Sequence, residues 1–463
     1  MHRWTRHAMS LQVRTQIMVY AEIQTWYFWI IRRRKNKIFE FKLLIYRDRS
    51  SSFFHLKCFY YLTNSNMQAL PYHKQVRDYL KKQKRSWEWF AKAEIKQQQV
   101  QEFRAHLLRN SYRIDATANS RVHELLEQAK QALSLECSVA LYQAAGFDQM
   151  NAGISFLNEE AHLVFSGNLL SILDDQELLA LLAHELSHIL LFSIEAGEYE
   201  LSDRMIAALA DNQETASQYA ETARLFSLST ELYCDRAALK ATEAIEPIIS
   251  LLLKMQTGLS KVSVESFLKQ ADELLQSEEG SKGVSHPENF IRAKSLQLYF
   301  DAGEIAEDKI HQLLVGKPSF YNLDVFLRGK LKKYTKTVLQ QLLSPEWMRT
   351  DENTNLASQY FKNFDANKQA KVLSPLHSLL TVSESSSNYF SYLLYDFVSC
   401  DPELKNFTLA WCWQIAQQLD ITNSFKKTVR KEQELSARRF QFLLDQSTQD
   451  LNTLQKDKEG NVD

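Results

Sequence analysis

The sequence predicts an α+β protein that is mainly helical and carries one small antiparallel sheet. Its 463 residues include only 11 glycines and 7 prolines, far below the roughly 12% share that these two residues have on average. Long stretches rich in leucine, alanine, glutamine, glutamate and lysine favour helices, whereas three short runs in the first half are rich in β-branched and aromatic residues. The scarcity of turn-forming residues therefore argues for a helical framework around a single small sheet.

Residues 1–66 differ in composition from the rest of the chain. They hold twelve lysines and arginines against three acidic residues, are rich in aromatic side chains and contain no glycine or proline. Such a segment is typical of a basic-aromatic arm that contacts a membrane surface or nucleic acid. Alternatively, translation starts at Met67 and the upstream residues are disordered or not part of the native protein, which the lack of a helical or strand period favours. Membrane association through this segment stays open, but a net charge of −1 predicts no nucleic-acid partner.

The next segment of the chain is predicted to be helical, and the one after it is predicted to contain the sheet. Residues 67–111 form a predicted helical N-terminal segment, because apolar anchors recur there at helical spacing. Residues 112–302 form the predicted main domain, and three runs near its start, separated by Gly, Asn and acidic residues, read as strands. These runs are 137–142, 152–157 and 162–165.

A long buried helix is predicted after the strands. Asp174 and Glu177 have the spacing of a capping box, and Gly197 is a typical C-terminal stop. The residues between them are apolar on nearly every side, so the helix is predicted to lie inside the core. Its most apolar run, 178–194, is interrupted by polar residues, so no segment is expected to span a membrane.

The remainder of the chain is predicted to be helical. The stretch 303–318, with two glycines, is the predicted boundary between the main domain and a helical accessory domain at 319–455, and 456–463 is a predicted frayed tail. The five cysteines are odd in number and lack CxxC spacing, which suits a reducing compartment. Since no signal peptide is recognisable, we expect a cytoplasmic protein.

One motif in the buried helix carries chemistry, because residues 184–188 read His-Glu-Leu-Ser-His. Positions four apart share one face of a helix, so the imidazoles of His184 and His188 can reach one metal ion. Glu185, next to the first imidazole, can accept a proton from the water that the metal activates. The competing interpretation is a pair of core histidines satisfied by hydrogen bonds. Three titratable groups in an apolar helix are costly without a partner such as a metal, which favours a zinc site.

A further ligand is expected from another part of the chain. Glu231 and Asp235 lie four residues apart in a helical stretch with many apolar neighbours. One carboxylate could bind the metal while the other supports a ligand imidazole, and the spacing does not say which does which. Cys234 lies about 100° round the helix from each neighbour, so it is interpreted as a packing residue.

These residues resemble the motifs of the gluzincin peptidases of metallopeptidase family 48, which include HtpX and the CAAX prenyl protease. The family pattern is HExxH, then ExxxD, then His-Pro separated from an Arg by four residues, and all three parts occur here in order. The resemblance covers roughly residues 112–299 and implies a zincin-type core that binds one zinc ion. By residue, it implies that His184, His188 and Glu231 bind zinc, that Glu185 is the base, that Asp235 orients a ligand, and that His286 and Arg292 support the oxyanion or its surroundings.

The resemblance also bears on the substrate. Asn151 and Ala152, which open the presumed edge strand, are similar to the strand on which the family pairs an extended peptide by β-augmentation. The membrane members flank this core with spanning helices, so the chain looks like a soluble metalloendopeptidase acting on a peptide or an unfolded protein. The alternative is a catalytically weak or inactive protein of this fold, acting as a binding or scaffold module through residues 319–455.

Overall fold

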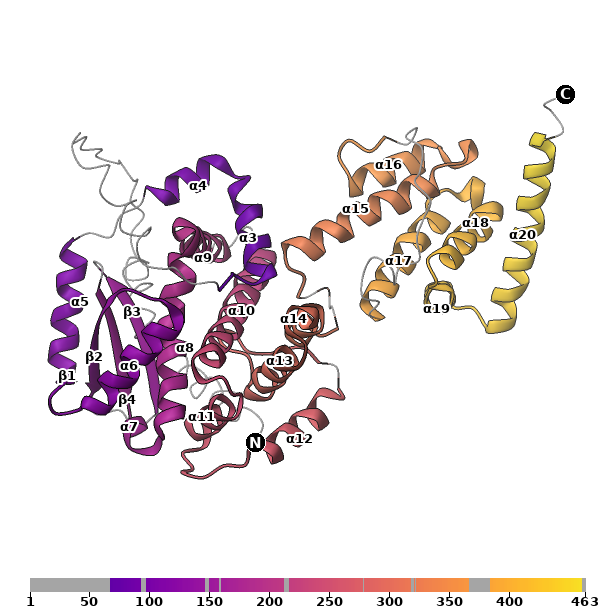
Figure 1. Ribbon diagram of the computed structural model, residues 1–463. Helices are drawn as coiled ribbons and strands as arrows, with labels where there is room; N and C mark the ends of the chain where they lie inside the picture. The colour runs from indigo at the N-terminus through magenta and orange to yellow at the C-terminus, as the bar shows by residue number, and fades with distance from the viewer. Residues whose placement is uncertain are drawn as a thin grey trace, which may run out of the picture.

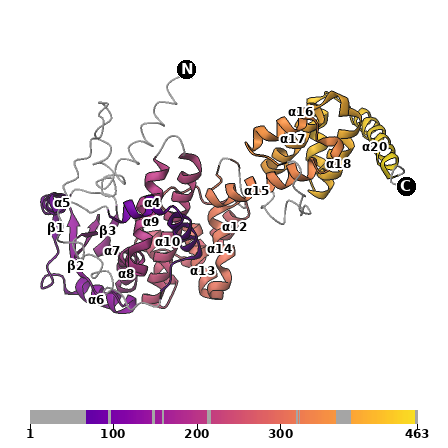
Figure 2. The ribbon, with the colours of Figure 1, turned by 90° about the horizontal axis from the view of Figure 1, so that it is seen from above.

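The computed structural model describes residues 67–459 apart from 93–96, 146–149, 158–159, 212–215, 278, 318–319, 321 and 366–383. Figures 1 and 2 show the described residues as two groups of helices, joined at the start of α15 (Val325–Leu342). Each group has its own apolar core: the buried residues of the first run from Ala69 to Leu314, and those of the second from Leu323 to Leu444. The predicted arm at 1–66 lies outside the described residues.

A four-stranded sheet lies in the first group of helices, which together with the many helices confirms the mainly helical α+β class. Three strands match the predicted runs, and a short fourth strand precedes them. The strand order is β1-β2-β4-β3. The strands are β1 (Ser111–Arg113), β2 (Ser138–Ala144), β3 (Asn151–Leu157) and β4 (Glu160–Ser166).

The prediction that the sheet is antiparallel is wrong for one pair of strands. β1 pairs with β2 and β3 pairs with β4 in antiparallel fashion, but β2 runs parallel to β4, with Leu141 opposite Leu163. The reason is that the β3–β4 hairpin folds back so that β4, not β3, lies beside β2. An apolar run identifies a strand, but it does not say which neighbour the strand takes.

Different helices cover the two faces of the sheet. Because side chains alternate along a strand, Ala140 and Tyr142 of β2 pack with Leu107 of α5 (Gln97–Asn110), whereas Leu141 points into the main core. On that second face, α6 (Ser120–Leu133) packs against α8 (Asp175–Ser193), and α8 packs against β3 (Figure 1). The far side of α8 is covered by α10 (Ala216–Thr242). The helix with the HExxH motif is therefore enclosed by protein.

Local contacts determine where α8 begins and ends. The capping box is confirmed, because the Glu177 amide donates to Asp174 Oδ1 and the Asp174 amide donates to Glu177 Oε2, both at 2.9 Å. Lys254 Nζ, from α11 (Glu246–Thr257), also donates to Glu177 at 2.7 Å, which ties the start of α8 to a second helix. The helix ends at Ser193, ahead of the predicted stop, and Gly197, with φ of 78°, instead precedes α9 (Glu198–Ala210).

Among the residues that the structure describes, one helical stretch, Asp175–Ala210, is long and apolar enough to cross a membrane, with a mean hydropathy of 1.5. No membrane-spanning segment was predicted, because polar residues interrupt the most apolar run, but these residues are too few to lower the mean hydropathy of this stretch below that of a spanning helix. Its most apolar window is 83% buried inside the protein, which is the character of a core helix.

The first core draws on more of the chain than residues 112–302. Val76 and Leu80 from α3 (Pro71–Lys81) are buried in it, as are Ile310 and Leu314 from α14 (Glu307–Val315), although 303–318 had been predicted as a boundary. The domain limits themselves stay predictions. The remaining elements of this group are α3 (Pro71–Lys81), α4 (Lys84–Ala91), α7 (Leu169–Ile172), α12 (Val264–Leu275), α13 (Asn289–Ala302) and α14 (Glu307–Val315), with 3-10 turns at Ile194–Gly197 and Gly303–Ala306.

The second group is helical throughout its described residues. Its core is built around four fully buried phenylalanines, Phe390, Phe397, Phe425 and Phe440. After α15 come α16 (Asp351–Tyr360), α17 (Glu384–Cys400), α18 (Lys405–Gln418), α19 (Thr422–Glu432) and α20 (Ala437–Glu459), with 3-10 turns at Glu346–Met348 and Pro402–Leu404.

Candidate metal and catalytic site

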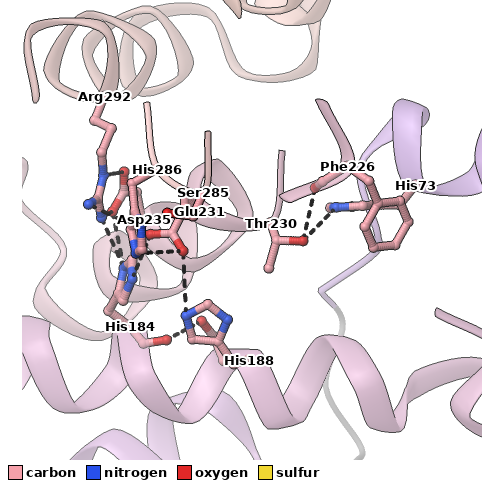
Figure 3. A network of polar contacts seen from close by, with 11 residues as sticks. His73, His184, His188, Phe226, Thr230, Glu231, Asp235, Ser285, His286 and Arg292 are labelled. Atoms are coloured by element: carbon pink, nitrogen blue, oxygen red, sulfur yellow. Dashed lines mark hydrogen bonds and ion pairs between the residues drawn. The ribbon is translucent and has the colours of Figure 1, made fainter. Parts of the chain in front are cut away.

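Three elements bring the predicted site residues together. α8 supplies His184, Glu185 and His188, and α10 supplies Glu231 and Asp235. Helices α8 and α10 pack against each other along the core. The segment that leads into α13 and the first turns of that helix supply His286 and Arg292. Figure 3 shows His184 and His188 projecting from α8 toward the other labelled groups of the site.

The three predicted metal ligands converge. His184 Nε2 lies 3.4 Å from Glu231 Oε2, and His188 Nε2 lies 3.9 Å from Glu231 Oε1. Two atoms that bind one tetrahedral zinc ion at about 2.0–2.2 Å lie roughly 3.4 Å apart, so these separations are close to those that a shared ion requires. In addition, Glu231 Oε2 is buried and has no hydrogen-bond partner among the described residues. The donor set therefore fits a zinc ion.

Asp235 and Arg292 both contact His184 at its Nδ1 nitrogen, and Arg292 also binds Asp235. Asp235 Oδ1 lies 3.1 Å from His184 Nδ1, which leaves the other ring nitrogen facing Glu231. Arg292 binds the same carboxylate with two donors, Nε at 2.9 Å and Nη2 at 2.5 Å, and its Nη1 lies 3.7 Å from Glu231. Burial alone would raise the pKa of Asp235, but the Arg292 guanidinium lowers it, so that Asp235 stays ionised beside the imidazole.

The pKa values of the two imidazoles are shifted in opposite directions. Burial lowers the pKa of His188 to about 4, so this ring is neutral, as a metal ligand must be. Burial also acts to lower the pKa of His184, but the nearby carboxylates of Asp235 and Glu231 raise it to about 9. Without an ion, a proton on His184 balances the two carboxylates; a bound cation would take over that role.

Glu185 lies beside the ligands and is buried, with 8% of its surface exposed. Burial raises the pKa of its carboxyl group to about 7, and the neighbouring His184 opposes this increase. A carboxyl group with a pKa near neutrality can both accept and release a proton, which is the property that a general base of peptide hydrolysis needs.

His286 contacts the carboxylate of Glu231. Its Nε2 lies 3.3 Å from Glu231 Oε1, and its Nδ1 lies 2.9 Å from Ser285 Oγ (Figure 3). The side chain is 35% exposed, more than those of His184, Glu231 and Asp235. It therefore stands where solvent, and a substrate, can approach. The described contacts of Arg292 lie instead with Asp235, Glu231 and His184. This arrangement suits a support for the ligands rather than for an oxyanion.

Cys234, which was predicted to be a packing residue, lies close to both imidazoles. Its Sγ, one nitrogen of His184 and one nitrogen of His188 all lie within 4.8 Å of one another. The thiol is fully buried, and burial together with the nearby Glu231 carboxylate raises its pKa well above the usual range. The Glu231 carboxylate lies 3.4 and 3.9 Å from the two imidazoles and is the third ligand that the resemblance implies. The spacing was a usable signal, because Cys234 follows Glu231 by three residues and so shares its side of the helix.

Asn151 and Ala152 occupy an edge of the sheet, as predicted. They open β3, whose one described neighbour is β4, and Ala152 pairs with Phe165 in that ladder. The Asn151 side chain accepts the Ala152 amide at 2.9 Å. Because α8 packs against β3, this edge belongs to the same part of the fold as the candidate ligands.

Comparisons with known proteins agree with this geometry. Residues 116–299 match the family model of Peptidase family M48. A curated protein of Arabidopsis thaliana, plastoglobule-localized metallopeptidase 48, chloroplastic, is 27% identical over 201 residues, which are 38% of this chain and 56% of that protein. The chain thus spans about half the length of this relative. No solved structure matches the chain significantly. These comparisons support the assignment of residues 116–299 to a domain of the peptidase family M48 type.

Proposed function

We propose that this protein is a zinc-dependent endopeptidase that hydrolyses peptides or unfolded proteins. The observation that carries the proposal is the convergence of His184, His188 and Glu231 at separations close to those of one shared ion. In addition, one buried oxygen of Glu231 has no hydrogen bond to any residue that the structure describes. The match of residues 116–299 to peptidase family M48 supports the peptidase chemistry. We infer one zinc ion per chain.

The ion and the protein residues would have separate tasks. When bound by His184, His188 and Glu231, zinc would polarise the scissile carbonyl and acidify the attacking water. Glu185 accepts the proton of that water on a carboxylate oxygen and later delivers it to the nitrogen of the leaving amine. His286 donates from Nε2 to the carbonyl oxygen as negative charge develops there. Asp235, held by Arg292, keeps His184 in place.

The substrate would lie along β3. An extended peptide can add to a free sheet edge through main-chain hydrogen bonds, and Asn151 and Ala152 stand at the start of that edge. Main-chain pairing does not select particular side chains, so peptides and unfolded proteins of varied sequence fit this mode. A cytoplasmic location is part of the same proposal.

A second candidate function is supported by one observation, the separate core of the second group of helices. A region with its own core can present a binding surface that does not depend on catalysis. In that case the M48 domain would serve as a scaffold.

The experiment that tests these functions compares the proteome of cells that make the wild-type chain with that of cells that make Glu185→Gln. An endopeptidase generates new protein termini that are absent with the variant. Identical termini in both samples, together with the same co-purified partners, would reject the endopeptidase in favour of the scaffold.

A further inference from the structure

His286 lies on a segment without regular secondary structure. The segment 279–288 precedes α13, so no helix or strand ladder fixes its backbone. His286 Nε2 nevertheless lies only 3.3 Å from Glu231 Oε1. Because a hydrogen-bond donor to an oxyanion acts only within a narrow range of positions, something outside the segment must hold it.

Arg224 on α10 binds this segment at two points of its backbone. Its Nη1 donates to the carbonyl oxygens of Ser281 at 3.0 Å and of Gly283 at 2.9 Å. Its Nε and Nη2 donate to the Glu221 carboxylate at 2.8 and 2.7 Å, which pairs the charge of the guanidinium. Arg224 precedes Glu231 by about two helical turns, so one helix carries both a predicted metal ligand and the anchor of the segment.

Further contacts close the segment around this anchor. Glu288 accepts the Ser281 hydroxyl at 2.7 Å and the Lys282 amide at 2.9 Å, and the Ser281 amide donates to Leu314 O at 3.0 Å. At Gly283 a Cβ would collide with the carbonyl oxygen of His286, so the segment turns tightly on itself at the residue that Arg224 binds. The backbone position of His286 is thereby linked to the Arg224 guanidinium.

We propose that Arg224 is a positioning residue, which holds segment 279–288 so that His286 meets the carbonyl oxygen of the substrate. This inference rests on the proposed peptidase function. Arg224 acts through His286, since its donors are directed at Glu221 and at the backbone of the segment. Ser285 completes the arrangement by holding Nδ1 of the imidazole, so that Nε2 faces the site.

The test uses the full chain with the double substitution Arg224→Met/Glu221→Gln. The methionine keeps the apolar stem of arginine, and the glutamine avoids an unpaired buried carboxylate. The matched control is Arg204→Met/Glu200→Gln on α9. There the arginine also binds a glutamate with two donors, at 2.6 and 3.0 Å, but its further donor points to Phe90 O.

Three measurements separate positioning from general stability: amide hydrogen exchange of 279–288, zinc content, and kcat and KM with fluorescein-labelled casein. In the Arg224 variant we expect exchange of the segment to be at least about 10-fold faster, with zinc unchanged. We expect kcat to fall about 10-fold with KM unchanged, compared with about 10²- to 10³-fold for His286→Ala. The control should match wild type in all three.

The decisive experiment combines the Arg224 variant with His286→Ala. Because Arg224 acts through His286, the combined variant should be no slower than His286→Ala alone. Losses that multiply would overturn the proposal, as would unchanged exchange of 279–288, whether or not wild type cleaves casein. If wild type fails to cleave casein while exchange of the segment accelerates, the proposed function fails and the anchoring of the segment by Arg224 stands.

Discussion

The two cores of this protein differ in what they bury. The first encloses His184, Glu185, Glu231, Asp235 and Arg292, each at most 8% exposed. In the described part of the second core, the buried polar side chains are mostly neutral. Of the two buried carboxylates among the described residues that follow the first core, Asp401 accepts the Glu403 amide at the start of a 3-10 turn. Asp324 caps α15 and also accepts the hydroxyl of Tyr72, a residue of the first core.

This difference indicates where chemistry takes place. Charged groups are costly to bury unless they are paired or bind a metal, so a buried cluster of them needs a reason beyond packing. Apolar packing with capping aspartates needs no such reason. The first core is therefore the candidate for catalysis and the second for structure or binding.

The largest effect is expected from Glu185→Gln, which removes the proton acceptor but no ligand. Turnover of labelled casein should fall by about 10²- to 10⁴-fold, while zinc content and melting temperature stay constant. The control in the second region is Asp401→Asn, whose amide oxygen can still accept the Glu403 amide, and it should retain full activity. Equal activity of Glu185→Gln and wild type would show that Glu185 is not the base, and the first core would no longer be the candidate for catalysis.

A cavity in the second core should leave the zinc site intact. Phe390 is fully buried there, so Phe390→Ala should destabilise that core by about 3–5 kcal/mol. Calorimetry should show the loss, with zinc per chain unchanged. Phe165→Ala, at a fully buried position of the first core, is the matched control and should impair zinc retention. If Phe390→Ala released zinc as readily, the two cores would be one cooperative unit.

The identity of the third ligand sharpens the description of the first core. Loss of outer supporting groups alone weakens metal affinity by about 10- to 100-fold, so Glu231→Ala should cost more than about 100-fold. Cys234→Ala should keep its zinc. Metal titration and the absorption of the cobalt-substituted protein check both, because a cobalt–thiolate bond has its own charge-transfer band. Zinc retained by Glu231→Ala and lost by Cys234→Ala would make the thiolate the ligand.

The smallest effect concerns His73, which joins α3 to α10 with its Nε2 3.2 Å from Thr230 Oγ1 (Figure 3). Burial lowers the pKa of His73 from 6.5 to about 3, so the folded protein keeps this ring neutral. The unfolded chain binds a proton below about pH 6.5, and stability is therefore lost as the pH falls through this window.

At pH 5.5 this one group should cost about 1.4 kcal/mol relative to pH 7.5. His73→Phe cannot titrate, and urea unfolding at both pH values should show a correspondingly smaller loss for the variant. Equal losses in the two proteins would show that His73 carries its proton in the folded state.

How much the sequence could predict depended on whether a feature is local. The capping box at Asp174 and Glu177 was predictable because both partners lie within one turn. The i, i+4 spacings placed His184 with His188, and Glu231 with Asp235, on shared helix faces. The three longer strands were visible as β-rich runs. All of these follow from the period of a helix or strand, which neighbouring residues determine.

Contacts between different helices and strands could not be predicted from these periods. The parallel pairing of β2 with β4 depends on how a hairpin folds back, and the bond of Lys254 to Glu177 depends on how α11 packs against α8. The sequence motif named Arg292, but only the packing of α13 shows that it binds Asp235.

The sequence by itself therefore identified the candidate side chains for the chemistry of this protein and determined which of them share a helix face. Only the tertiary structure decided how the faces meet, that Cys234 lies within reach of both imidazoles, and that Arg224 holds the segment that carries His286. The physical reason is that helical periodicity arises from backbone geometry within a few residues. Contacts between distant elements arise from burial of apolar surface, which every residue of the core shapes together.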